Sequence, residues 1–154
     1  MPPQAQPHFN FIALIISTLI PMIMGFLYYH PSVLGKTWMS ANGFTKESMG
    51  KGPKPVLYLV CLFTSFLLTF FLWGWVTGAG GLDQFQVIDP VDGHSFVTFK
   101  HGVFHGIAFT LMVLIPIFCS MAIFERRTWK WAFVNIGYWS ISIILMCGVL
   151  SAMR

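Results

Sequence analysis

Charged residues are scarce in this sequence. Asp, Glu, Lys and Arg make up 9% of the 154 residues, whereas hydrophobic residues make up 56%. A soluble domain of ordinary composition is about a quarter charged, because charge covers its surface. The shortage therefore excludes an ordinary soluble domain and indicates a chain that lies largely within a membrane.

Cysteine is also sparse, and its placement excludes two common uses. Cys61, Cys119 and Cys147 all lie within apolar runs and form no CxxC pair. This placement is typical of packing residues and not of a disulfide framework or a zinc ribbon. Nucleophile elbows, Walker loops and dinucleotide-binding glycine patterns are missing too. The basic residues form no stripe, so we expect no nucleic-acid partner.

Long apolar runs are what the sequence does contain. A hydrocarbon core about 30 Å thick is crossed by roughly 20 residues of helix. Four runs qualify, at about residues 9–29, 55–76, 101–124 and 131–153, and none contains Asp, Glu, Lys or Arg. We therefore expect a single all-α transmembrane domain over residues 1–154, folded as an antiparallel bundle of four transmembrane helices.

The connectors between these runs differ in charge. Residues 30–54 carry four lysines, and residues 125–130 carry two arginines and one lysine. Residues 77–100 instead carry three aspartates and one lysine. The positive-inside rule places basic connectors in the cytoplasm. We expect a multi-pass protein of the inner (cytoplasmic) membrane, with the acidic connector and both termini outside.

Two connectors have local structure of their own. The stretch "SANGFTKESMGKGPKP" predicts a short helix capped near Thr45, followed by a Gly/Pro connector. The stretch "DQFQVIDPVDGHSFVTF" has two β-prone runs around an Asp-Gly turn signal. We expect the second stretch to form a short outer β-prone flap between the second and third transmembrane helices.

Small and polar residues recur at helical spacing inside the apolar runs. Inside lipid, polar groups need partners and small residues let helices approach closely. The predicted packing and polar-core positions are Asn10, Pro21, Gly25, Tyr28, Gly102, Gly106, Asn135, Tyr138 and Ser142. Pro21 is expected to kink its helix, since proline cannot donate the backbone hydrogen bond.

Two histidines stand at the start of the third run. His101 and His105 are four residues apart, so they project from one side of a helix and can share an ion. With His94 or Asp92 they resemble a Zn or Cu site in ligand type. The same histidines could instead hydrogen-bond loop carbonyls or headgroups, or take part in proton transfer. Apart from such an ion we predict no cofactor, and we expect bound lipid.

Two stretches carry a family resemblance. They are "GFLYYHPSVLGKTWM", and "HGVFHGIAF" followed by "FERRTWKWAFVNIGYWSISIILMCGVL". Together they resemble the family of domain of unknown function 1761, which comprises small bacterial and fungal integral membrane proteins. Tyr28 stands where the pattern has Trp, and Leu34 where Phe is commoner.

The resemblance implies the architecture with about four spans and supplies no activity. It directs attention to a set of positions spread over the chain. They are Gly25, Tyr29, Pro31, Gly35, Trp38, His101, Gly102, Asn135, Gly137 and Tyr138. Asn135 is polar within a span, so we expect it to find a partner such as Tyr28 across the bundle.

The pattern favours a non-enzymatic accessory or scaffold unit that acts in an oligomer or a larger membrane complex. One alternative is a transporter or channel-like protein for a small solute, ion or metal, with His101 and His105 at its outer entry. Transport pathways usually need ionisable residues within the spans. Another alternative is a membrane enzyme with a metal site on the outer face.

Overall fold

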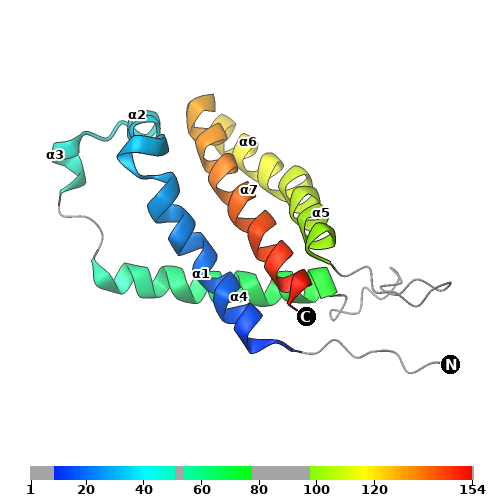
Figure 1. The fold of residues 1–154 in the computed structure, drawn as a ribbon. Coiled ribbons are helices and arrows are strands. Elements are labelled where there is room, and N and C mark those ends of the chain that lie inside the picture. Colours follow the sequence, from blue (N-terminus) through cyan, green and yellow to red (C-terminus); the bar gives the residue numbers. More distant parts are fainter. Residues whose placement is uncertain (1–8, 51–53, 78–97, 154) are drawn as a thin grey trace, which may run out of the picture.

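The fold is built from long apolar helices (Figure 1). The computed structural model describes residues 9–50, 54–77 and 98–153, and contains no strand among them. Helices α1 (Phe11–Tyr28), α4 (Pro55–Thr77) and α7 (Trp129–Ala152) each form from one apolar run. A fourth helical segment covers Phe99–Phe124. All four are long and apolar enough to cross a membrane, as the sequence predicted.

The third span is helical throughout but changes its winding near the middle. It consists of α5 (Phe99–Phe109), a π-helical turn η2 (Thr110–Leu114) and α6 (Ile115–Phe124). Pro116 follows this turn and has no backbone N–H to offer the Met112 carbonyl. A wider turn at this point is a common way for a helix to continue past such a break.

The first connector folds against the end of the long helices. It contains a π-helical turn η1 (Pro31–Gly35), helix α2 (Lys36–Asn42) and helix α3 (Lys46–Met49). The short helix predicted near Thr45 is confirmed. The Thr45 hydroxyl accepts a hydrogen bond from the Ser48 N–H at 3.2 Å, and the Ser48 hydroxyl accepts one from the Thr45 N–H at 2.9 Å.

Helix α7 is the centre of the molecule. It packs against α1, α4, α5, α6 and α2. Its residues Ile143, Met146, Cys147 and Leu150 are buried almost completely. They meet buried side chains from the other long helices, namely Ala13, Leu72, Val76 and Leu114.

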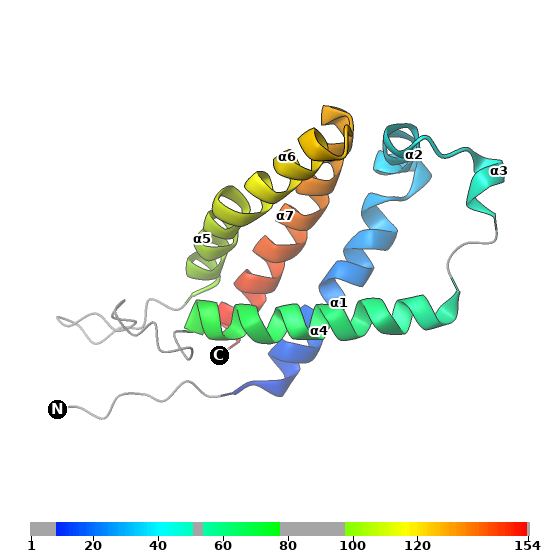
Figure 2. The same ribbon diagram turned by 180° about the vertical axis from the view of Figure 1, so that it is seen from behind.

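Helix α4 takes a different direction from its neighbours. Figures 1 and 2 show α1, α7 and the α5–α6 segment running alongside one another, with α4 lying across them. The predicted antiparallel bundle would instead have α4 alongside α1. The buried residues of α4 begin at Ser65 and continue through Thr69, Leu72 and Val76, so the helix packs mainly through its second half. The predicted β-prone flap falls at residues 78–97, outside the described residues.

At two ends of the molecule, side chains join segments that are far apart in the chain. At one end the Asn10 amide donates a hydrogen bond to the Met153 carbonyl, and the Ser151 hydroxyl donates to the Thr98 carbonyl at 2.6 Å. At the other end the Lys130 ammonium donates to the Ser40 hydroxyl at 3.2 Å. Residues of the first and third connectors therefore meet at one end of the molecule.

Candidate functional site

Two tyrosines exchange hydrogen bonds between the first and last spans. The Tyr28 hydroxyl on α1 donates to the Val134 carbonyl on α7 at 3.1 Å. In return, the Tyr138 hydroxyl on α7 donates to the Pro21 carbonyl on α1 at 2.7 Å. A Cβ on Gly137 would come within 2.5 Å of the Tyr28 hydroxyl oxygen, so this glycine makes room for the phenol. The exchange holds α1 and α7 in one register.

An aromatic cluster continues from these tyrosines toward the basic end. The Tyr29 ring centroid lies 5.0 Å from that of Tyr138 and 5.2 Å from that of Trp38. Burial raises the pKa of the Tyr29 phenol, and the neighbouring Tyr138 and Tyr28 raise it further. Gly35 lies so close to the carbonyls of Tyr29 and His30 that any side chain there would overlap them. The first connector is thus packed onto α7 through neutral aromatic rings.

Helices α5 and α7 approach each other through glycine. A Cβ on Gly102 would overlap the Cys147 carbonyl group, and one on Gly106 would lie 2.6 Å from the Ile144 Cα. Gly148 on α7 is close to the Phe99 ring of α5. A Cβ added at Gly148 would lie 2.5 Å from a carbon of that ring. Small residues permit this backbone-to-backbone contact within a membrane.

The paired histidines lie on the neighbouring side of α5. The ring centroids of His101 and His105 are 4.5 Å apart, and both side chains are half-buried. The ring of Trp75, on α4, lies edge-on to His105 with 5.9 Å between centroids. The Thr98 hydroxyl accepts a hydrogen bond from the His101 N–H at 3.4 Å, so Thr98 supplies the N-cap of α5. The His105 imidazole therefore faces the end of α4.

Trp75 is a member of this site that the sequence did not predict. Its indole Nε1 is buried and has no hydrogen-bond acceptor among the described residues. In the sequence Trp75 resembles any interfacial tryptophan at the end of a span. No spacing rule could connect it with His105, because residues 78–97 separate the two helices.

The remaining predicted site residues lie apart from the histidines. His94 and Asp92, the other proposed metal ligands, are outside the described residues. Asn10 caps α1, its side-chain oxygen accepting from the N–H groups of Ile12 and Ala13 at 3.0 and 3.1 Å. Asn135 donates to the Trp131 carbonyl of its own helix at 2.8 Å, not to α1. Helix α1 continues through Pro21 without a break.

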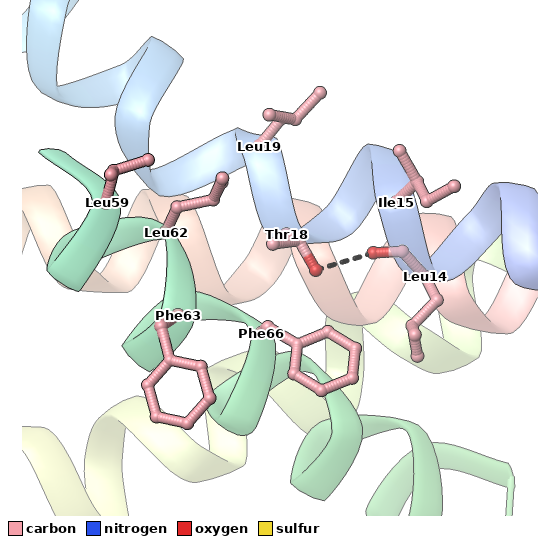
Figure 3. Close-up of a pocket in the computed structure, with 8 residues that line it drawn as sticks. All are labelled: Leu14, Ile15, Thr18, Leu19, Leu59, Leu62, Phe63 and Phe66. Carbon is pink, nitrogen blue, oxygen red and sulfur yellow. Dashed lines mark hydrogen bonds between the residues drawn. The ribbon is translucent and has the colours of Figure 1, made fainter.

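An apolar groove separates α1 from the first half of α4 (Figure 3). Its volume is about 420 Å³. The lining residues are Leu14, Ile15, Thr18, Leu19, Leu59, Leu62, Phe63 and Phe66. The hydroxyl of Thr18 donates to the Leu14 carbonyl of its own helix at 2.8 Å. The groove therefore offers a guest only hydrocarbon surface.

Sequence comparison places the chain in a family. Residues 12–151 match the family described as "Protein of unknown function (DUF1761)". The chain belongs to this family. The match confirms the resemblance noted in the sequence. No curated protein and no solved structure matches the chain.

In this DUF1761 protein, the positions that the resemblance singled out fall in two regions. Tyr29, Trp38 and Tyr138 meet in the aromatic cluster, with Gly35 and Gly137 making room beside them. His101 and Gly102 lie at the other end, at the start of α5. The family description carries no activity.

Proposed function

We propose that this DUF1761 protein is a non-enzymatic membrane scaffold or accessory unit that assembles with a second copy of itself. The contact surface is the α1–α4 face, defined as the eight residues that line the groove. The observation that carries the proposal is the groove itself, an apolar hollow between two crossing spans with large side chains standing on either side of it (Figure 3).

Two shapes on the α1–α4 face favour pairing with a second copy. Phe63 is 62% exposed and stands beside the hollow, so one copy presents both a projecting ring and a recess. A surface that carries both shapes can pair with itself around a two-fold axis. Helices within lipid associate through close van der Waals packing, which a recess filled by a partner's side chain provides.

The polar side chains of the spans support a structural role. Tyr28 and Tyr138 bind backbone carbonyls across the α1–α7 contact. Ser142, Asn135 and Thr69 donate to carbonyls of their own helices at 2.8–2.9 Å. Each of these groups is engaged in holding a helix or a helix pair, which favours a scaffold over a pathway for polar solutes.

The orientation in the membrane follows from the basic end. We assign the end formed by residues 30–54 and 125–130 to the cytoplasm, and the end that carries Asn10 and Met153 to the outside of the inner membrane. Reporter fusions test this assignment. A periplasmic alkaline phosphatase fused after Met153 is expected to be active, and activity of a cytoplasmic reporter at the same point would contradict it.

Cysteine cross-linking in native membranes tests the assembly. In a chain carrying Cys61→Ser and Cys119→Ser, a cysteine at Phe63 is expected to give a covalent dimer on mild oxidation. A cysteine at Phe104, which is 68% exposed on α5, is the matched control and is expected to stay monomeric. Equal cross-linking at both positions, or none at Phe63, would refute the proposed surface.

Lipid is the competing occupant of the groove. Mass spectrometry of the protein released from membrane nanodiscs distinguishes a groove filled by a second copy from a groove filled by lipid. A dimer without acyl chains at the groove supports the proposal. A monomer that retains one phospholipid, and loses it when Thr18→Leu and Leu62→Phe fill the groove, would overturn it in favour of lipid binding.

A further inference from the structure

We propose that His101 and His105 bind one divalent transition-metal ion, of the Zn²⁺, Cu²⁺ or Ni²⁺ class, at the contact between α4 and α5. Trp75 closes the site on the α4 side and donates a hydrogen bond to an oxygen ligand of the ion. This assignment is independent of the scaffold role and of the α1–α4 face.

The arrangement of the two imidazoles suits a shared ion. Side chains four residues apart lie one above the other on a helix, and the ring centroids of His101 and His105 are 4.5 Å apart. The glycine contact with α7 fixes the rotation of α5 about its axis, since Gly102 and Gly106 must face that helix. The adjacent His105 is thereby held against Trp75, with His101 stacked beside it.

The ligand chemistry selects the class of ion. Imidazole in its neutral form ligates Zn²⁺, Cu²⁺ and Ni²⁺, whereas Mg²⁺ and Ca²⁺ require oxygen ligands. The two imidazoles therefore select a transition-metal ion over Mg²⁺ or Ca²⁺.

Trp75 points to an additional ligand at the same place. A buried indole N–H without an acceptor costs free energy, and buried polar groups are normally paired. The centroid of the Trp75 ring lies 5.9 Å from that of His105, and the indole Nε1 is buried without an acceptor among the described residues. A water bound to the metal offers the missing acceptor. Groups that hydrogen-bond to the ligands of a metal ion tune the affinity of the site for that ion.

Metal titration of the purified full chain tests the site. The protein is prepared without a polyhistidine tag, stripped with EDTA and titrated with Zn²⁺ and with Cu²⁺ by calorimetry. We expect one ion per chain, and loss of that binding when His101→Asn and His105→Asn are combined. His30→Asn is the matched control and is expected to bind like the parent chain, because His30 lies at the basic end.

Tryptophan fluorescence locates the ion independently. Cu²⁺ is expected to quench part of the emission of the parent chain, and Trp75→Phe is expected to remove that part while one ion still binds. Circular dichroism confirms that each variant remains helical. Absence of binding by the helical parent chain, or unchanged binding by the helical double histidine variant, would refute the site.

Discussion

Two helix contacts in this molecule are built in opposite ways. Between α5 and α7, glycines bring the backbones together until a single added Cβ at Gly102 would overlap a carbonyl of the other helix. Between α1 and α4, leucines and phenylalanines hold the helices apart and leave a groove of about 420 Å³. The first contact is complete within one chain, whereas the second leaves hydrocarbon surface for another molecule. Substitutions at the two contacts should therefore have different consequences.

Gly102→Leu is expected to have the largest effect. A side chain here must push α5 away from the Cys147 carbonyl, and backbone cannot yield as a flexible side chain can. Overpacking of this kind costs about 3 kcal/mol. The measurement is the yield of monodisperse protein in mild detergent together with the free energy of unfolding in SDS. Phe104→Leu on the lipid-facing side of α5 is the control, and an equal loss in both variants would contradict the contact.

Asn10→Ala is expected to have the second-largest effect on stability. The substitution removes the N-cap of α1 and the hydrogen bond that joins α1 to the Met153 carbonyl. Loss of such a cap costs about 1 kcal/mol, and we expect about 2 kcal/mol here because the inter-helix bond is lost too.

Asn10→Asp separates the two contributions, since a carboxylate retains the cap but cannot donate to Met153. Its expected loss lies between those of the parent chain and Asn10→Ala. Thr45→Ala, which removes the cap of the exposed helix α3, is expected to leave the unfolding of the long helices unchanged. The free energy of unfolding of all three variants is measured in SDS, with circular dichroism monitoring the loss of helix.

Tyr28→Phe and Tyr138→Phe test the exchange between α1 and α7. Each variant loses one hydrogen bond to a carbonyl of the other helix and retains its ring. We expect each to destabilise the fold by about 1 kcal/mol. Tyr58→Phe, on the exposed side of α4, is the control for loss of a phenol hydroxyl and should have little effect. A double variant no weaker than either single variant would indicate that the two bonds act as one unit.

Phe63→Ala is expected to have the smallest effect on the fold and a clear effect on assembly. The side chain is exposed on the α1–α4 face, so the stability of the single chain should change by no more than about 0.5 kcal/mol. Self-association measured by energy transfer in liposomes should fall. A large loss of stability would show that the face is part of the core of one chain.

The sequence predicted the elements of this fold well. The four runs without Asp, Glu, Lys or Arg form four long helices, and the capping residue Thr45 begins the short helix α3. These features depend on local composition and capping, which a sequence displays directly.

The direction of α4 could not be predicted in the same way. Its residues 55–63 are apolar on every side, so no stripe of small or polar residues shows which face packs there. Trp75 and Tyr138 were missed as partners of His105 and Pro21 for a related reason. Each pair joins residues far apart in the chain, and neither spacing nor residue type reveals such contacts.

The bond between Asn10 and the Met153 carbonyl joins the first long helix to the last. A ribosome releases these helices in order, so α1 enters the bilayer long before α7 is made. Until then the Asn10 amide and the Tyr28 hydroxyl have to rely on water, lipid headgroups or the insertion machinery for partners. Completion of the α1–α7 pair therefore waits until α7 has been synthesised, and a nascent chain that stalls before α7 would be left with α1 unpaired.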